Sequence, residues 1–305
     1  MVLFKILRIS VIVLCVLAPV ARGQDKSATA RQVEVLVKHL RESYGQWRRA
    51  VMESDARSWK TWTAPHRQIE VRNRLVSEKR PFPRAVSELP APPPRISNLK
   101  CLYLSKKGKT AKASFFGKVN FGVGGEPTEN LLVLSYVRGR DRWLYDRADF
   151  VNLTALPEVR EELAAGKLDY FRETAEVKAS GVVPETPRAV PVAKYIAKVY
   201  VFCPGREVKV TVNGISDHRF ANAKEAEVVI GGAQDGRNEV TFTTEPLEGA
   251  TGREALAVRV YLMSEIEGTK PIMAYEYLAN EGEPVPGKKA GEFAVDRDTA
   301  RRLVP

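Results

Sequence analysis

Cysteine and histidine are scarce in this sequence. The 305 residues include three cysteines and three histidines. Small secreted domains that are held together by disulfides carry more cysteines than this. His39, His66 and His218 share none of the short spacings, such as i and i+4 on one helix, that direct two ligands to one metal ion. The sequence therefore predicts no disulfide framework, no metal site and no cofactor.

Long apolar runs are also missing, since no stretch reaches the ~20 residues that a membrane-spanning helix needs. The longest candidate, residues 11–21, follows Lys5 and Arg8 and precedes Ala21-Arg22-Gly23. A basic start, a short apolar run and small residues before a cleavage site are typical of a secretory signal peptide. A membrane anchor is the alternative, and the shortness of the run argues against it. We expect residues 1–23 to be a signal peptide, and the protein to be periplasmic, envelope-associated or secreted.

Sequence motifs of the commonest reactions do not occur. There is no glycine-rich phosphate loop and no nucleophile elbow. The composition, with 44% hydrophobic and 28% charged residues, is that of an ordinary globular protein. At ~100–200 residues per domain, the length predicts two domains. The sequence therefore indicates architecture and compartment more directly than reaction.

The N-terminal part of the chain has the pattern of helices. After residue 30, apolar residues recur at three- and four-residue steps, as on the buried face of a helix. Thr29-Ala30-Arg31-Gln32 fits a capping box that would begin this helix at Thr29. Asp55 is expected to cap a second helix, and Pro65 to open a third that extends to about Lys79. The prolines that follow, at 81, 83, 90 and 92–94, exclude further regular helix.

From residue 96 the apolar period changes to two, which indicates strands. A Lys-Lys-Gly-Lys turn at 106–109, a glycine-rich loop at 122–125 and a charged turn at 138–142 separate them. This order predicts three or four antiparallel strands with the helices packed on one face of the sheet. A further helical piece is expected at 156–165. Residues 24–177 are therefore expected to form an α+β domain.

Residues 178–193 contain three prolines and little periodicity, which is typical of a linker. The remaining residues, 194–305, alternate apolar and polar side chains in short runs. Asn213-Gly214 and Asp235-Gly236 supply turns in which a positive φ is easy. This pattern predicts an all-β sandwich domain. The expected strands are at 195–203, 206–213, 226–231, 237–244, 255–262, 271–278 and 292–296.

Three motifs follow one another within residues 33–152: a Tyr44-x-x-Trp47 helix, an Asp55-x-x-x-Trp59 turn and a strand Trp143-Leu144-Tyr145-Asp146-Arg147. Together they resemble the nuclear transport factor two-like (SnoaL-like) superfamily. The resemblance implies a cone-like domain, in which helices lie on a curved antiparallel sheet around a pocket. Some members are enzymes, such as polyketide cyclases and ketosteroid isomerases, and many others bind ligands or assemble without catalysis. The proline-rich stretch 81–94 departs from the family by lengthening the connection between helices and sheet.

The second domain carries a weaker pattern, in residues 208–214 and in the run Gly236-Arg237-Asn238-Glu239-Val240-Thr241. This pattern is similar to immunoglobulin-like sandwich modules of exported bacterial proteins. The similarity implies a module that positions, stiffens or binds, because such modules seldom catalyse.

Three carboxylates are candidates for acid–base chemistry in the pocket that the resemblance implies. Such chemistry needs a carboxylate in apolar surroundings, which raise its pKa. Asp55 is better explained as a helix cap, and Asp146 and Asp149 as ion-pair partners of Arg142 and Arg147. A small-molecule enzyme of the cyclase or isomerase type is therefore the alternative function.

All four tryptophans lie in the first domain, close in sequence to several other aromatic residues. They either line a pocket for an apolar or ring-bearing ligand or simply fill the core, as large buried aromatics commonly do. The candidate pocket residues are Tyr44, Trp47, Trp59, Trp62, Tyr103, Phe115 and Tyr136.

Basic residues concentrate in residues 57–118, which contain 15 basic and only three acidic residues. In an exported protein the available polyanions are lipid headgroups, wall polymers and acidic polysaccharides. The lysines of one predicted hairpin lie close enough for their potentials to add, so we expect them to contact an anionic surface. The alternative is a basic surface that only keeps the protein soluble. The six lysines are Lys100, Lys106, Lys107, Lys109, Lys112 and Lys118.

Cys101 and Cys203 lie in different expected domains, so they form either an interdomain disulfide or two small buried side chains. Taken together, the sequence predicts an exported, non-enzymatic binding or scaffolding protein of a bacterial cell envelope. Its expected partner is an anionic envelope component or another envelope protein. No nucleic-acid partner is expected, because no aromatic-interleaved basic motif occurs. No transmembrane span is expected after signal cleavage.

Overall fold

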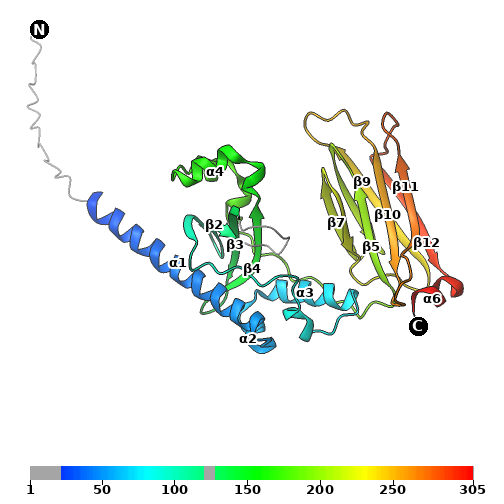
Figure 1. The fold of residues 1–305 in the computed structure, drawn as a ribbon, viewed down its shortest axis with the longest axis horizontal. Helices are drawn as coiled ribbons and strands as arrows, with labels where there is room; N and C mark the ends of the chain where they lie inside the picture. The colour runs from blue at the N-terminus through cyan, green and yellow to red at the C-terminus, as the bar shows by residue number, and fades with distance from the viewer. Residues whose placement is uncertain (1–21, 120–127, 305) are drawn as a thin grey trace, which may run out of the picture.

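The computed structural model describes residues 22–119 and 128–304. Within them the chain is mixed α+β, with six α-helices and three four-stranded antiparallel sheets (Figure 1). Residues 1–21, which hold most of the expected signal peptide, lie outside the described residues. The glycine-rich loop expected at 122–125 lies outside them as well.

Helices open the chain, as the periodicity predicts. The side chain of Asp55 accepts hydrogen bonds from two backbone N–H groups of the second helix, and Pro65 occupies the first turn of the third, which confirms both expected starts. The capping box at Thr29 is wrong, because the first helix already begins at Arg22. Residues 24–30 hold good helix formers and no proline, so nothing in them stops the helix. These helices are α1 (Arg22–Met52), α2 (Ala56–Trp62) and α3 (Pro65–Ser77).

The first sheet is a four-stranded meander, in which each strand pairs with its sequence neighbour. The expected turn at 106–109 joins the first two strands, with Gly108 at a φ of 53°. The expected turn at 138–142 joins the last two. The strands are β1 (Lys100–Lys107), β2 (Thr110–Val119), β3 (Thr128–Arg138) and β4 (Trp143–Val151).

Both faces of this sheet are covered, whereas the sequence predicted helices on one face only. α1 packs against one face through Leu40 and Tyr44. The opposite face is covered by α4 (Pro157–Ala164) and α5 (Asp169–Glu173), whose buried Leu163 and Phe171 join a second core. The helix expected at 156–165 is therefore confirmed, but it forms a layer of its own.

The C-terminal region contains two further four-stranded sheets, with strand orders β11-β10-β5-β8 and β12-β9-β6-β7. Buried residues of both sheets belong to one hydrophobic core. All seven expected strands are present with shifted ends, and one strand and the last helix were not expected. The elements are β5 (Ile196–Phe202), β6 (Arg206–Val212), β7 (Ser216–Ala221), β8 (Lys224–Val228), β9 (Gly236–Pro246), β10 (Leu256–Met263), β11 (Ile272–Ala279), β12 (Lys288–Val295) and α6 (Arg297–Leu303).

Hydrogen bonds tie α3 to the end of the linker and to the C-terminal region. The Asn73 amide donates to Arg188 O at 2.8 Å and accepts from Val190 N at 3.1 Å. Ser77 Oγ accepts from Gly231 N at 2.8 Å. The residues after 187 are thus held by α3, while Val182 is 71% exposed.

Candidate functional site

A groove between α1 and the first sheet is the candidate binding site. One stripe of α1 forms its first wall, because Gln32, Leu36 and His39 recur at four- and three-residue steps and so share one side of the helix. Arg31 and Val35 lie four residues apart beside them. The stripe faces the sheet along the part of α1 that precedes Leu40, the first fully buried residue of the helix from residue 31 onward.

The strand register assembles the opposite wall. Arg138, the last residue of β3, pairs with Trp143, the first residue of β4, and its N–H donates to Lys109 O at 2.8 Å. Leu104 and Lys106 lie two residues apart on β1, so they project from the same face. Leu104 packs on the core beneath α1, which assigns that face to the groove.

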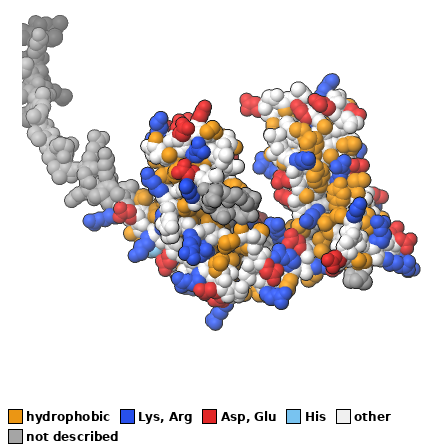
Figure 2. Space-filling model, in the orientation of Figure 1, with side chains coloured by type: hydrophobic (Ala, Val, Ile, Leu, Met, Phe, Trp, Pro, Cys, Tyr) orange, Lys and Arg blue, Asp and Glu red, His pale blue; other side chains and the backbone are white. Residues whose placement is uncertain are grey.

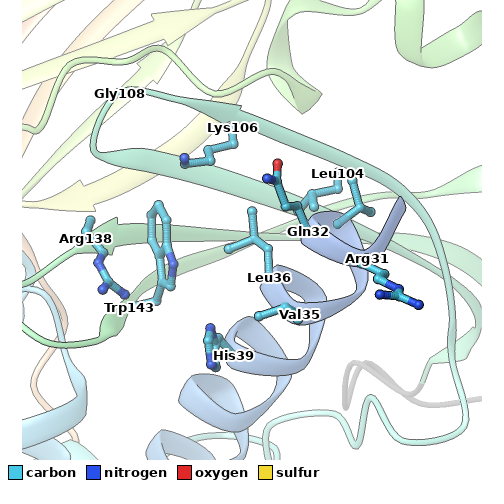
Figure 3. Close-up of a pocket in the computed structure, with 11 residues that line it drawn as sticks. Arg31, Gln32, Val35, Leu36, His39, Leu104, Lys106, Gly108, Arg138 and Trp143 are labelled. Atoms are coloured by element: carbon cyan, nitrogen blue, oxygen red, sulfur yellow. The ribbon is translucent and has the colours of Figure 1, made fainter. Parts of the chain in front are cut away.

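The groove has a volume of about 680 Å³ and opens to solvent (Figure 3). This volume lies within the ~300–1,000 Å³ typical of small-molecule sites. Its lining is mainly apolar, with three Lys or Arg side chains and no carboxylate among the described residues. The lining consists of Arg31, Gln32, Val33, Val35, Leu36, His39, Leu104, Lys106, Gly108, Arg138 and Trp143.

Side chains of α1 fix the helix, and with it one wall of the groove, to the proline-rich stretch 81–94 and to the residues that follow it. Arg41 donates hydrogen bonds to Ile96 O at 2.6 Å and to Leu99 O at 3.0 Å. The Tyr44 hydroxyl donates to Pro94 O at 2.8 Å. The proline-rich stretch 81–94, which departs from the resembled family, therefore helps to hold α1 in place beside the groove.

The chemistry of the groove is that of binding. The Arg138 guanidinium lies 5.7 Å from the centroid of the Trp143 ring, a cation–π contact that orients it. Lys106 and Arg138 form no ion pair with any described residue. The described lining contains one imidazole, that of His39, and no hydroxyl, thiol or carboxylate beside it.

The aromatic residues proposed as a ligand pocket do not form one site. Tyr44, Trp47, Phe115 and Tyr136 lie together in the core between α1 and the sheet. The rings of Trp47 and Tyr145 are 4.0 Å apart, and burial raises the pKa of the Tyr44 hydroxyl. None of these five residues lines the groove.

The other three aromatic candidates lie elsewhere. Trp59 belongs to a separate core beside α3. Trp62 is half-buried, and the Arg142 guanidinium lies 4.9 Å from its ring centroid. Tyr103 stacks on Phe171 at 4.9 Å, on the face of the sheet that α5 covers. Trp143, one of the four tryptophans expected either to line a pocket or to fill the core, is the tryptophan that lines the groove.

The six hairpin lysines are divided between the two faces of the sheet. Lys106 lines the groove, whereas the next residue, Lys107, lies against Gly181 of the linker. Lys112 is half-buried and donates to Glu176 O, and burial lowers its pKa. On the face shown in Figure 2, basic side chains are interspersed with acidic ones. The remaining lysines, Lys100, Lys109 and Lys118, are exposed.

The carboxylates also take defined places. Asp149 pairs with Arg147 at 3.4 Å, as expected. Asp146 pairs instead with His66, whose Nε2 lies 2.8 Å from Oδ1, because the start of α3 bonds to β4 through Ala64 N and brings His66 alongside. Both side chains are nearly buried, and neither lines the groove.

One constellation was missed by the sequence reasoning. Ser216 Oγ lies 2.7 Å from His218 Nε2, and His218 Nδ1 lies 2.7 Å from Glu227 Oε2. This order matches nucleophile, base and acid in hydrolase triads. However, Ser216 is 0% exposed and its Oγ accepts from Ile230 N at 2.7 Å, so no substrate reaches it. The three side chains join β7 to β8.

The sequence predicted no strand around His218, although this residue belongs to one. It lies on β7, where buried and exposed residues alternate. Ser216, His218 and Phe220 occupy the buried positions, and this alternation was the available signal. The exposed polar residues between them, next to Asn213-Gly214, gave the segment the composition of a turn.

A second cavity of about 640 Å³ lies between α3, the linker and β7. Its described lining combines prolines and isoleucines with two carboxylates, Glu70 and Asp217, and with Arg188. Glu70 already pairs with Arg67 at 2.9 Å, and Asp217 accepts from Thr211 Oγ1 at 2.7 Å. Charges of both signs thus leave this cavity without a clear electrostatic preference.

Both cysteines of the described chain are free thiols. Cys101 is half-buried and Cys203 is buried, and burial raises the pKa of each. No group of three or more His, Cys, Asp or Glu within residues 22–119 and 128–304 is arranged to hold a metal ion. In the same residues, no helix combines the length and apolar character needed to cross a bilayer.

Fold and groove together define a mixed α+β protein with an apolar surface groove that carries cationic side chains. Comparisons of the chain with protein-family models, with curated proteins and with solved structures give no match. Function must therefore be argued from the groove itself.

Proposed function

We propose that the chain is an exported, non-enzymatic binding or scaffolding protein of a bacterial cell envelope, and that the groove is its binding site. The groove carries this proposal, because it is concave, mainly apolar and of ligand size. Its partner would be an anionic envelope component or a region of another envelope protein, in keeping with the cationic side chains in its lining.

Export is supported by residues 1–23, with their basic start, short apolar run and small residues around the cleavage site. N-terminal sequencing of protein recovered outside the cytoplasm tests it. We expect Gln24 as the first residue, and exported protein that still begins at Met1 would contradict a cleaved signal.

We also propose that the first region is a cone-like domain related to the nuclear transport factor two-like superfamily, and the second an immunoglobulin-like sandwich. In support of the first, α1 crosses one face of a four-stranded antiparallel sheet. In support of the second, two four-stranded antiparallel sheets share one core. Both types of module commonly bind or position other molecules.

An enzyme of the cyclase or isomerase type is the alternative, and it needs a buried carboxylate beside a Tyr or His in an open cavity. Asp146 and His66 are buried together, but they line neither of the two cavities described above. The groove, which is the candidate binding site, is lined by cationic and apolar side chains instead. The geometry therefore favours binding.

A neutral apolar fluorophore, N-phenyl-1-naphthylamine, tests the groove. Val35→Trp places a large side chain on the exposed wall of the groove, and Val182→Trp is the matched control on the exposed part of the linker. We expect the parent and Val182→Trp to bind the probe alike, and Val35→Trp to bind it about tenfold more weakly, a loss of about 1.4 kcal/mol. Equal binding by all three proteins, or no binding by the parent, would contradict the proposal.

A further inference from the structure

The charges of the groove are concentrated near Trp143. The Arg138 side chain and the Lys106 ammonium both lie near this ring, as Figure 3 shows. Because Arg138 is held by strand pairing and by its contact with Trp143, its position is set before a ligand arrives. A guanidinium binds carboxylate or phosphate oxygens in pairs, and a nearby ammonium adds a point charge.

Two acidic residues, Glu42 and Asp141, line an adjoining cavity together with Arg138, but neither forms an ion pair with it. The carboxylate closest in sequence, Asp141, pairs with Arg142 at 2.6 Å, and this hydrogen bond is the main reason that its pKa is lowered. Arg138 lowers the pKa of Asp141 further, but only as the weakest of the causes. In the described part of the chain, Lys106 and Arg138 therefore remain available to an anion.

The rest of the groove offers an apolar wall to whatever carries that anion. Leu36 and Leu104 line it between the helix and β1. Val33 and Val35 are 44% and 53% exposed, although the burial of apolar side chains away from water is favourable. An apolar chain laid along this wall would cover them, while its charged end reached the cations.

We propose that the ligand is a single-chain anionic amphiphile, a carboxylate or phosphate on an alkyl chain. Its head would lie between Lys106 and Arg138, and its chain would lie along Leu36 and Leu104. This assignment rests on the proposed function, because it names the ligand class of the same groove. The proposed ligand is a single molecule in the groove, not an extended anionic surface. The hairpin lysines are split over two faces of the sheet and so present no flat basic surface.

The test compares dodecanoate, dodecyl phosphate and dodecyltrimethylammonium, each below its micelle concentration, as competitors of N-phenyl-1-naphthylamine on the full chain. Lys106→Gln and Arg138→Gln remove one cation each. Lys107→Gln and Arg140→Gln are their matched controls, because both residues are exposed and lie outside the groove lining.

We expect at least one of the two anions to bind about tenfold or more tightly than the cation of equal chain length. Lys106→Gln and Arg138→Gln should each weaken that anion about tenfold and leave the neutral probe unchanged, and the controls should behave as the parent. The anion that binds more tightly identifies the preferred head group as carboxylate or phosphate.

If dodecyltrimethylammonium binds as tightly as the anions, the proposed ligand class is wrong. It is also wrong if Lys107→Gln and Arg140→Gln weaken anion binding as much as Lys106→Gln and Arg138→Gln. In either case, continued binding of the neutral probe would leave the proposed function standing, whereas loss of all binding would remove both. Anionic vesicles provide the last comparison. If Lys107→Gln weakens vesicle binding as much as Lys106→Gln and no monomeric anion binds, a membrane surface replaces the single ligand.

Discussion

Individual side chains of α1 secure the proline-rich segment by bonding to its carbonyl groups. Arg48 donates to Pro93 O at 2.7 Å, next to the bond from the Tyr44 hydroxyl to Pro94 O. A segment with so many prolines has few N–H donors of its own, so it depends on side-chain donors from elsewhere. These contacts link a local peculiarity of the sequence to the position of the groove.

Tyr44→Phe should therefore lower stability. The substitution keeps the ring in the core but leaves Pro94 O without its donor, which costs about 0.5–1.5 kcal/mol for a typical hydrogen bond. Urea unfolding followed by tryptophan fluorescence measures the change. Tyr261→Phe is the control, because the Tyr261 hydroxyl forms no hydrogen bond with described residues. A loss no larger than that of the control would show that the bond is not stabilising.

Ser216 should not react as a nucleophile. A fluorophosphonate probe that labels active serines should leave the folded protein unlabelled, because Ser216 is 0% exposed. Mass spectrometry of the treated protein detects the adduct. A single adduct on Ser216 in the folded protein would mean that the site opens, and it would revive the enzyme interpretation.

Ser216→Ala should instead destabilise the fold. It leaves Ile230 N and His218 Nε2 without their common partner, and an unpaired buried group costs about 1–3 kcal/mol. Ser97→Ala, at an exposed residue, should change little. The difference between the two urea midpoints measures the effect, and equal midpoints would contradict a structural role.

The sequence predicted parts of the groove but not their assembly. It singled out Lys106 and Trp143 from charge and from motif, and it placed Leu36 on an apolar helical stripe. It could not show that the part of α1 before Leu40 faces the sheet across an open groove, because that depends on how the helix lies across the strands. It also placed Tyr103 with Phe115, since the shift in strand register between Cys101 and Tyr103 cannot be read from alternation.

At the scale of elements, strands with regular alternation were predicted well, and their ends were less certain. β4 begins at the predicted Trp143, and β6 and β10 match within a residue or two. β7 was missed because two of its three buried side chains, Ser216 and His218, are polar, so apolar alternation is absent. α6 was missed because it is short and its start signal, Asp296, follows directly after a strand.

Charged side chains join β6 to β7 across the sheet surface, and they make stability depend on pH. Hydrogen bonds from Arg219 and Lys209 lower the pKa of Glu207 to about 2, from a usual value of 4.5. A carboxylate with a lowered pKa stabilises the folded state above about pH 4.5, and this contribution is lost as the pH falls toward 2.

Urea unfolding of the parent and of Glu207→Gln between pH 7 and pH 2 tests this contribution. We expect the parent to be the more stable protein at pH 7, by a small amount because the two cations, Arg219 and Lys209, are exposed to solvent. The difference should shrink below about pH 4.5 and vanish near pH 2. A difference that stays constant over this range would exclude the ion pair as its source.

At the scale of the whole molecule, the chain has separate cores joined by a short bonded connection. The cores of the first region end at Val177, and the core of the second begins at Tyr195. Between them, Asn73 holds the linker by donating to one backbone group and accepting from another, because its amide carries both a donor and an acceptor. The expected linker, 178–193, is therefore exposed near Val182 and bonded to α3 near Val190.

Limited proteolysis should reveal this division of the linker. A glutamate-specific protease should cut the parent first after Glu185, where the side chains are exposed, and leave two resistant fragments. Trypsin should cut slowly after Arg188, because its carbonyl is bonded to Asn73, and Asn73→Ala should make that cut faster. Glu185→Gln is the control that removes the first cut alone. Cleavage confined to the termini, with one resistant core, would show instead that the two halves unfold as a single unit.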